Sequence, residues 1–556
     1  MTTSPTSAPG SVGRSDPRQA ALAALSDQTF DLAIVGGGIT GAGIARDAAL
    51  RGLKVALVEK LDFGAGTSSK SSKMVHGGLR YLENGELGLV FESVNERNFL
   101  MTKARHLVRP LPFMVASYKG DRRMLMTIDF GVWLYEALCF FRSPTGQLHD
   151  TFGPRRTIEL EPGLKRDGLK GSVIYSDAQT DDARLTLENV LDARANGAVV
   201  LNHARAGALL RGDADRVTGV KVIDELGGGT VDVRAKVVVN ATGPWSDEVR
   251  ALAGAPATLK PARGSHVVID AKRLPVTHAF MMFAPRDARV VFCIPWGTGR
   301  TVIGTTDTFY EGSLDDVYAD RDDVQYLLDT ANKYFPGAKL QLEDVLATWS
   351  GLRPLIKPSK DVNASKVSRE HVVESQPGFM TIAGGKLTTY RRMAEDLVDQ
   401  ALAEQLGGKR PPATEKRPLP GGDGLKTEDD LRAREAALEG FGKDVAASLV
   451  AMYGVRGATV AERIAADATA GERLDAELPF LNAQVDEAID VELAATLDDV
   501  LSRRVPMLLR GRDQGLAAAD AVSRRMAARL GWDEARRARE LELYRAVVER
   551  SRRFRQ

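Results

Sequence analysis

A glycine-rich turn between a short apolar strand and a helix is the feature that most constrains the fold of this 556-residue chain. Residues 30–35 have the composition of a buried strand and lead directly into Gly-Gly-Gly-Ile-Thr-Gly at residues 36–41. Residues 39–50 are small or helix-forming, and residues 54–59 form a second apolar run. The pattern predicts a βαβ unit whose G-x-G-x-x-G turn approaches the pyrophosphate of a dinucleotide at a helix N-terminus.

The acid that ends the second apolar run supports dinucleotide binding. We expect Gly36, Gly38 and Gly41 to lie along the pyrophosphate, and Glu59, about 20 residues further on, to accept hydrogen bonds from ribose hydroxyls. This motif alone does not distinguish NAD from FAD. Three further segments favour FAD: a loop of small residues at 64–81, a buried strand and glycine turn at 236–245, and a strand, glycine pair and helix at 381–390.

The overall charge argues against a nucleic-acid partner. The 75 Lys and Arg residues nearly balance the 74 Asp and Glu residues, whereas nucleic-acid-binding domains usually carry a clear basic excess. Cys139 and Cys293 lie far apart in the sequence, so neither a disulfide framework nor a zinc site is indicated. We therefore expect no bound metal and a location in the reducing cytoplasm. No run of 18 apolar residues occurs, so membrane contact would have to be peripheral.

Five longer motifs make the chain resemble a known family. They are Ser-Lys-Met-Val-His-Gly-Gly-Leu-Arg-Tyr at 72–81, Arg-Gly-Ser-His at 263–266, Ile-Gly-Thr-Thr-Asp at 303–307, Ser-Gly-Leu-Arg-Pro at 350–354 and Gly-Gly-Lys-Leu-Thr-Thr-Tyr-Arg at 384–391. In this order they resemble the FAD-dependent glycerol-3-phosphate dehydrogenases of the D-amino-acid-oxidase superfamily. Arg263 stands where that family commonly has lysine.

The resemblance implies an α/β fold with a Rossmann-like FAD-binding domain, a substrate domain built on an antiparallel sheet, and an α-helical C-terminal domain. It also implies oxidation of sn-glycerol 3-phosphate to dihydroxyacetone phosphate by hydride transfer to N5 of a non-covalent flavin, with electrons passed to a membrane quinone. Three alternatives stay open: an oxidase that reduces oxygen to peroxide, a flavin amine oxidase selecting a carboxylate, and a flavin-binding scaffold or sensor without turnover. A homodimer is a further option.

Oxidation of a phosphorylated alcohol needs an anion clamp, a base and a hydride acceptor. Arg80 and Arg353 lie in motif turns where a guanidinium offers forked donors to phosphate, and the matched motif adds Tyr81 to the substrate-binding residues. His266 is our general base, because an imidazole titrates near neutral pH. Lys386 competes for that role, or supports negative charge beside the flavin. The expected cofactor-binding residues are Gly36, Gly38, Gly41, Glu59, Thr67, Ser68, Ser69, His76, Gly77, Ala241, Thr242, Gly243, Gly385, Lys386, Leu387 and Thr388.

The three FAD segments are far apart in the sequence, so we expect a discontinuous cofactor domain. The expected parts are a disordered lead at 1–28, the FAD-binding domain at 29–88, 170–250 and 346–404, a substrate-binding and membrane-contact domain at 89–169 and 251–345, a linker at 405–424 and a helical domain at 425–556. A hairpin is predicted at residues 290–303 of the substrate domain.

Two segments suggest contact with the cytoplasmic face of a membrane. Residues 124–141 are the most apolar stretch, and their two acids, Asp129 and Glu136, share one helix face; the segment is either an internal core helix or an amphipathic helix in the membrane interface, which the resemblance favours. Residues 501–556 contain 15 Arg and 7 acidic residues. This basic tail indicates a solvated helical face, with anionic lipid headgroups as a second interpretation.

Overall fold

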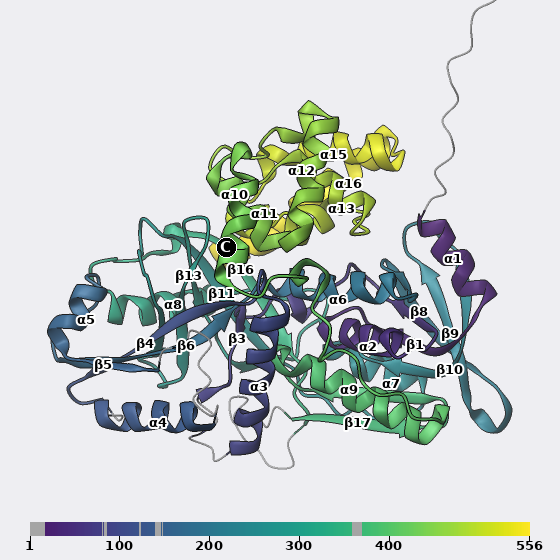
Figure 1. Ribbon diagram of the computed structural model, residues 1–556, viewed down its shortest axis with the longest axis horizontal. Helices are drawn as coiled ribbons and strands as arrows, with labels where there is room; N and C mark the ends of the chain where they lie inside the picture. The colour runs from purple at the N-terminus through teal and green to yellow at the C-terminus, as the bar shows by residue number, and fades with distance from the viewer. Residues whose placement is uncertain are drawn as a thin grey trace, which may run out of the picture.

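The computed structural model describes residues 17–79, 82, 86–121, 124–138, 146, 148–357 and 370–556, which form two β-sheets beneath a helical domain (Figure 1). The first sheet has the strand order β17-β18-β10-β1-β2-β7; all neighbours are parallel except β17 and β18. Strands β8 and β9 extend β10 in antiparallel pairing. The strands are β1 Thr29–Val35, β2 Val55–Val58, β7 Val199–Leu201, β8 Ala204–Arg211, β9 Val217–Asp224, β10 Thr230–Asn240, β17 His371–Gln376 and β18 Phe379–Gly384.

Both faces of the first sheet are covered, which explains why β1 and β2 are almost continuously apolar. Leu32 and Ile34 pack with the helices α2 (Ile39–Leu50), α6 (Asp182–Ala195) and α9 (Tyr390–Ala401), whereas Ala33 and Val35 pack on the opposite side, near α7 (Ser246–Leu252). The predicted βαβ unit is therefore confirmed as β1-α2-β2.

The second sheet has the strand order β15-β11-β14-β13-β12-β4-β6-β3, with β16 paired to β11 and β5 to β6. Its pairs are antiparallel except β12 with β4, so the predicted antiparallel sheet is confirmed with one parallel pair. The hairpin predicted at 290–303 is β13-β14. The strands are β3 Met74–Val75, β4 Arg109–Tyr118, β5 Asp150–Phe152, β6 Leu169–Gln179, β11 Ala262–Asp270, β12 Ala279–Phe283, β13 Val290–Trp296, β14 Arg300–Gly304, β15 Thr308–Phe309 and β16 Val345–Arg353.

Alternate residues of β4 serve two different hydrophobic cores. Met114 and Ala116 pack with α8 (Arg321–Tyr334), whereas Phe113 and Val115 pack with α3 (Leu87–Lys103) and α4 (Leu125–Leu138). The short helix α5 (Pro154–Leu160) packs beside β6. Since side chains alternate along a strand, α8 and α4 cover opposite faces of the second sheet.

The expected domain boundaries need two corrections. Strand β6 pairs with β4 along almost its whole length, and β16 pairs with β11 from Val345 to Arg353. Residues 169–179 and 345–353 therefore belong to the second sheet, although the sequence placed most of them in the FAD-binding domain. Backbone pairing over nine or more residues decides this, and pairing between distant strands leaves no local signature.

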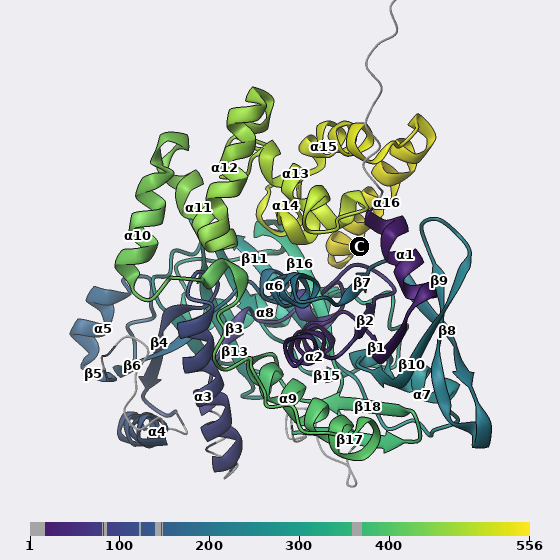
Figure 2. The ribbon, with the colours of Figure 1, turned by 45° about the vertical axis from the view of Figure 1, so that its right-hand side comes forward.

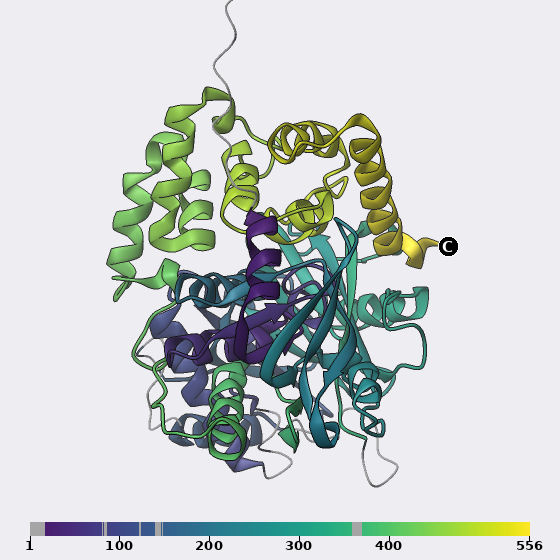
Figure 3. The ribbon, with the colours of Figure 1, turned by 90° about the vertical axis from the view of Figure 1, so that its right-hand side faces the viewer.

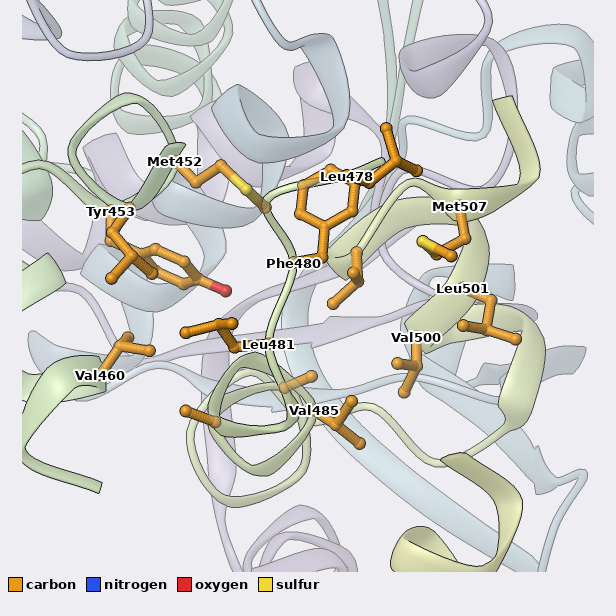
Figure 4. Close-up of a cluster of buried hydrophobic side chains, with 14 of the residues drawn as sticks. Met452, Tyr453, Val460, Leu478, Phe480, Leu481, Val485, Val500, Leu501 and Met507 are labelled. Atoms are coloured by element: carbon orange, nitrogen blue, oxygen red, sulfur yellow. The ribbon is translucent and has the colours of Figure 1, made fainter. Parts of the chain in front are cut away.

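The C-terminal part of the chain is helical, as predicted, and forms a separate layer above the sheets (Figure 3). Figure 4 shows side chains of its apolar core, among them Tyr453, Phe480, Leu481 and Val500. Its α-helices are α10 Glu428–Ala437, α11 Lys443–Tyr453, α12 Gly457–Ala466, α13 Asn482–Asp490, α14 Met507–Arg510, α15 Leu516–Leu530 and α16 Glu534–Arg552.

The expectation of a disordered lead over residues 1–28 is wrong for helix α1 (Pro17–Asp27). Leu25 is fully buried in the core on the α7 side of the first sheet, and Ala21 and Leu22 pack against the same core. Arg18 donates a hydrogen bond to the carbonyl oxygen of Asn202 at 2.8 Å and is ion-paired with Asp224. These tertiary contacts stabilise a helix that the local sequence does not strongly predict. Residues 1–16 lie outside the described part of the chain.

The basic tail is largely neutralised by acidic partners within the chain. Both Arg550 and Arg553, for example, pair with Asp316 of the loop before α8. The helical domain lies at one end of the molecule and α4 at the other (Figures 1 and 2), so one flat membrane surface would not contact both. The arginines of the tail that have ion pairs are Arg503, Arg504, Arg512, Arg524, Arg525, Arg529, Arg536, Arg537, Arg550 and Arg553.

Candidate active site

A cavity of about 630 Å³ runs between the two sheets, and both sheets supply its walls. The glycine turn, the end of β2 and the loop after β10 line it from the first sheet. Strand β11 and the end of β16 line it from the second sheet. A site of this form, at the carboxyl ends of parallel strands, is where doubly wound α/β folds bind dinucleotides.

The glycine turn leaves no room for side chains. A Cβ atom on Gly36, whose φ is +108°, would lie 2.7 Å from the carbonyl oxygen of Ala241, and one on Gly41 would lie 1.9 Å from the carbonyl oxygen of Gly36. Helix α2 begins after Gly38 without a side-chain cap. The N–H groups at a helix start favour an anionic ligand, so the turn fits a pyrophosphate, although the N–H of Ile39 already donates to Ser68 Oγ.

Glu59 lines the cavity and is already held by the backbone. Its carboxylate accepts hydrogen bonds from the N–H of Gly37 at 2.6 Å and the N–H of Leu61 at 2.9 Å. Burial raises its pKa above the usual value for a glutamate, although these hydrogen bonds oppose the shift. A carboxylate has about four acceptor positions, so two remain for ribose hydroxyls.

The loop after β2 is fixed to neighbouring elements by its small polar residues. Ser68 accepts a hydrogen bond from the N–H of Ile39 at the start of α2, and Thr67 donates to the carbonyl oxygen of Leu352. The backbone N–H of His76 donates to Thr388 Oγ1 at 3.3 Å. The first and third predicted FAD segments therefore meet directly.

Most of the predicted site residues meet in this cavity. Gly41 lies behind Gly36 and supports the turn, Ser69 belongs to the short helix at Thr67–Ser69, and Gly77 is buried against Tyr135. Arg80 and Tyr81 lie outside the described residues. The predicted residues that line the cavity are Gly36, Gly38, Glu59, Thr67, Ser68, His76, Ala241, Thr242, Gly243, His266, Arg353, Gly385, Lys386, Leu387 and Thr388.

His266 is almost completely enclosed on strand β11. Its ring stacks on Trp349 with centroids 4.7 Å apart, and its Nε2 lies 2.8 Å from Ser72 Oγ. Burial, together with the positive charges of Arg353 and Lys73, holds the pKa of His266 well below its usual value. The imidazole is therefore neutral at physiological pH and able to accept a proton.

Arg353 ends strand β16 and is anchored in place. Its guanidinium donates to Asp307 Oδ1 and to Thr305 Oγ1, both at 3.2 Å, and it packs across Gly264. Arg353 and Asp307 therefore form an ion pair. The guanidinium has five N–H donors in all, so this anchoring is compatible with holding an anion in the cavity.

Lys386 lines the cavity from the loop after β18. Its Nζ donates a hydrogen bond to Ser93 Oγ of α3 at 3.3 Å. The ammonium group therefore lies against α3, whereas the backbone of Lys386 follows β18 of the first sheet. This position fits either role predicted for it.

Several cavity residues were not predicted from the sequence. Ser72 belongs to the family motif at 72–81, and Thr305 and Asp307 belong to the motif at 303–307. Their positions in these motifs could therefore have identified them as site residues. Lys60, Trp245 and Asp315 also line the cavity and contact one another. Asp315 Oδ1 accepts hydrogen bonds from Lys60 Nζ at 2.7 Å and from Trp245 Nε1 at 3.0 Å. No local pattern marked Asp315, because its partners lie far away in the chain.

Two family models match the chain. One, described as "FAD dependent oxidoreductase", matches residues 31–391, and the other, described as "C-terminal domain of alpha-glycerophosphate oxidase", matches residues 412–537. The glycerol-3-phosphate dehydrogenase of Synechocystis sp. is 36% identical, covering 95% of this chain and 98% of that protein. The glycerol-3-phosphate dehydrogenase of Mycobacterium leprae is 40% identical, covering 96% and 90%.

A solved structure shares the whole architecture. The glycerol-3-phosphate dehydrogenase from Bacillus halodurans, complexed with FAD, superposes with a TM-score of 0.80 at 32% sequence identity, covering 96% of this chain and 97% of that one. The match extends over both sheets and the helical domain.

Proposed function

Since this chain belongs to the family of FAD-dependent glycerol-3-phosphate dehydrogenases, we propose that it oxidises sn-glycerol 3-phosphate to dihydroxyacetone phosphate. The observation that carries the proposal is that His266, Arg353 and Lys386 line the same cavity as the glycine turn. A neutral base, an anchored guanidinium and an ammonium group are the groups that oxidation of a phosphorylated secondary alcohol requires.

The residues of the cavity fit FAD. The glycine turn at the start of α2 would hold the pyrophosphate, and Glu59 the ribose of the adenosine half. Lys60, Trp245 and Asp315 would cover the same half. The backbone of the loops at His76 and at 385–388 would hold the flavin half. Bound there, FAD supplies a two-electron acceptor for a hydride.

Replacing Gly41 by alanine is expected to reduce the FAD content of the purified protein and its Tm. The new Cβ would lie 1.9 Å from the Gly36 carbonyl oxygen, so the turn must move away from its pyrophosphate-binding form. Overpacking of this kind usually costs about 1–3 kcal/mol. Gly88→Ala is the matched control, because nothing lies within 4 Å of its Cβ. Equal FAD content and Tm in both variants would contradict the role of Gly41.

In the proposed reaction, Arg353, together with Arg80, holds the phosphate of the substrate and so places the secondary alcohol near His266. His266 takes up the hydroxyl proton at Nε2, because its Nδ1 is enclosed. Lys386 stabilises negative charge that develops in the cavity.

We further propose that the electrons leave to a membrane quinone and that α4 rests on the membrane. Ile128, Val132 and Tyr135 of this helix are buried, whereas Met126 and Phe130 are 81% and 62% exposed. Glu136 accepts hydrogen bonds from His149, so this acid of the helix faces the protein. Among the described residues, no helix is long and apolar enough to cross a bilayer. An exposed apolar helix face fits peripheral contact.

The double variant Phe130→Glu with Trp133→Glu is expected to weaken binding to anionic phospholipid vesicles by at least tenfold. Both side chains are exposed, so the change removes apolar surface and adds charge without disturbing a core. Vesicle flotation measures the bound fraction. Leu543→Glu, an exposed leucine on α16, serves as control because α16 lies at the opposite end of the molecule (Figure 1). Undiminished flotation of the double variant would overturn the membrane contact.

The acceptor is tested by the product balance. The holoenzyme is given sn-glycerol 3-phosphate in air with a soluble quinone analogue, and dihydroxyacetone phosphate, quinol and peroxide are measured together. The proposal expects quinol to match the ketone and peroxide to stay far below it. One peroxide for each ketone would assign the chain to the oxidase alternative.

A further inference from the structure

The imidazole of His266 has one hydrogen-bond partner in the described part of the chain, Ser72. The imidazole is 2% exposed, and Trp349 covers one ring face. A Cβ on Gly304 of the neighbouring strand would lie 2.1 Å from the ring, so the ring and that backbone are in close contact. No described group hydrogen-bonds Nδ1, whereas Nε2 is hydrogen-bonded to Ser72. Protons therefore reach the ring from the side of Ser72.

Ser72 lies beside His266 at the wall of the cavity. It is only half-buried and lines the cavity together with the histidine. Its hydroxyl oxygen lies 2.8 Å from Nε2, a normal length for a hydrogen bond between these atoms. A hydroxyl is both donor and acceptor, so Ser72 can receive one proton while giving up another.

The segment that carries Ser72 is fixed on both sides. The backbone N–H and the hydroxyl of Ser71 donate to Asp182 Oδ2 at 3.0 and 2.7 Å, and Lys73 Nζ donates to Asp182 Oδ1 at 2.6 Å. Trp349 Nε1 donates to the carbonyl oxygen of Ser71 at 3.2 Å. Asp182 is completely buried. The tryptophan that stacks on His266 therefore also holds the serine loop, which fixes the Ser72–His266 geometry.

We propose that Ser72 carries the substrate's proton to His266, an inference that rests on the proposed function. The alcohol O–H bond breaks and its proton goes to Ser72 Oγ, while the proton of Ser72 goes to His266 Nε2. The carbon's hydrogen leaves with its electron pair to FAD, and the carbon–oxygen double bond forms. Ser72 ends as it began, His266 gains one proton, and the substrate loses two electrons. The step requires that the resting imidazole carries its proton on Nδ1.

The charges around the pair favour the neutral imidazole. Arg353 and Lys73 are the charged groups that act on His266, and each has its own acidic partner, Asp307 and Asp182. The relay therefore begins with a neutral acceptor and produces a cation next to two other cations. Such a cation returns its proton readily, through the same serine, once the product has left.

The test uses the holoenzyme and the variants Ser72→Ala, Ser72→Thr, His266→Ala and the double variant Ser72→Ala with His266→Ala. Anaerobic stopped-flow mixing with sn-glycerol 3-phosphate gives the limiting rate of flavin reduction, and calorimetry with dihydroxyacetone phosphate gives binding without turnover. We expect Ser72→Ala to lower the limiting rate by roughly 10- to 100-fold, with product affinity changed less than twofold. Ser72→Thr, which keeps the hydroxyl, should stay within about fivefold of wild type. The double variant should be no slower than His266→Ala alone, because the two residues act on one proton.

Each outcome has a separate meaning. A wild-type flavin that stays oxidised with this substrate overturns the proposed function, and the relay with it. A reactive wild type with an equally fast Ser72→Ala variant overturns the relay alone. The relay is also overturned if Ser72→Ala loses product affinity at an unchanged limiting rate, or if the double variant is slower than His266→Ala by the full factor of Ser72→Ala. If Ser72→Ala does not retain FAD, Ser72→Thr and Ser72→Cys are compared instead, and a cysteine variant as fast as the threonine variant contradicts a hydroxyl relay.

Discussion

Changing His266 to alanine is expected to slow flavin reduction by sn-glycerol 3-phosphate by about 10²- to 10⁴-fold, the usual contribution of a positioned general base. The residue lines the cavity, hydrogen-bonds Ser72 and is held by Trp349, so its ring is positioned to act as the base. Anaerobic stopped-flow absorbance measures the rate. FAD should remain bound, since the histidine lies on the second sheet, away from the glycine turn.

The pH dependence of wild type gives an independent check on His266. Its pKa lies well below the usual 6.5, because burial and the charges of Arg353 and Lys73 disfavour the protonated ring. A base must be deprotonated to act, so flavin reduction should persist as the pH falls through 6.5 and decline only at lower pH. His278→Ala is the control, because this histidine binds Glu161 and does not line the cavity. An acid limb at or above pH 6.5, or a fast His266→Ala variant, would contradict the assignment.

Replacing Arg353 by methionine is expected to lower kcat/KM for sn-glycerol 3-phosphate by about 30- to 1,000-fold. Loss of one partner of a partly buried, charge-assisted contact typically costs about 2–4 kcal/mol, which corresponds to that range. Most of the loss should be in KM if the guanidinium holds the phosphate equally before and during the reaction. Steady-state kinetics with a quinone analogue separate the two constants.

Two controls address the ion pair of Arg353 with Asp307. The double variant Arg353→Met with Asp307→Asn removes the uncompensated acid that the single change leaves behind. Arg263→Met changes another paired arginine that does not line the cavity, and should leave KM within about twofold. Restoration of wild-type KM by Asp307→Asn would show that Arg353 serves the ion pair rather than the phosphate.

Local sequence patterns were sufficient where structure depends on neighbours in the chain. The β1-α2-β2 unit was predictable because the glycine turn, the small residues of α2 and the apolar strands are consecutive. The helical C-terminal domain was also among the expected parts of the chain. Motif resemblance then brought together site residues that are more than 300 positions apart.

Contacts between distant segments account for what the sequence did not predict. Strands β6 and β16 were assigned to the wrong sheet because strand partners leave no local mark. Helix α1 depends on the burial of Leu25 by other segments. The sequence indicated a solvated helical face for the arginines of the tail. Many of them instead have acidic partners, such as Asp62 for both Arg503 and Arg504. Ser72 was one serine among several in its loop, and only the 2.8 Å distance to His266 Nε2 distinguishes it.

The most direct test of the proposed function is a single anaerobic mixing of the holoenzyme with sn-glycerol 3-phosphate. The flavin absorbance should bleach, and one dihydroxyacetone phosphate should form for each FAD, without any external acceptor. Glycerol without phosphate should bleach it far more slowly, because it has no phosphate for Arg353 to hold. A flavin that dithionite reduces but sn-glycerol 3-phosphate leaves oxidised would contradict the proposed function.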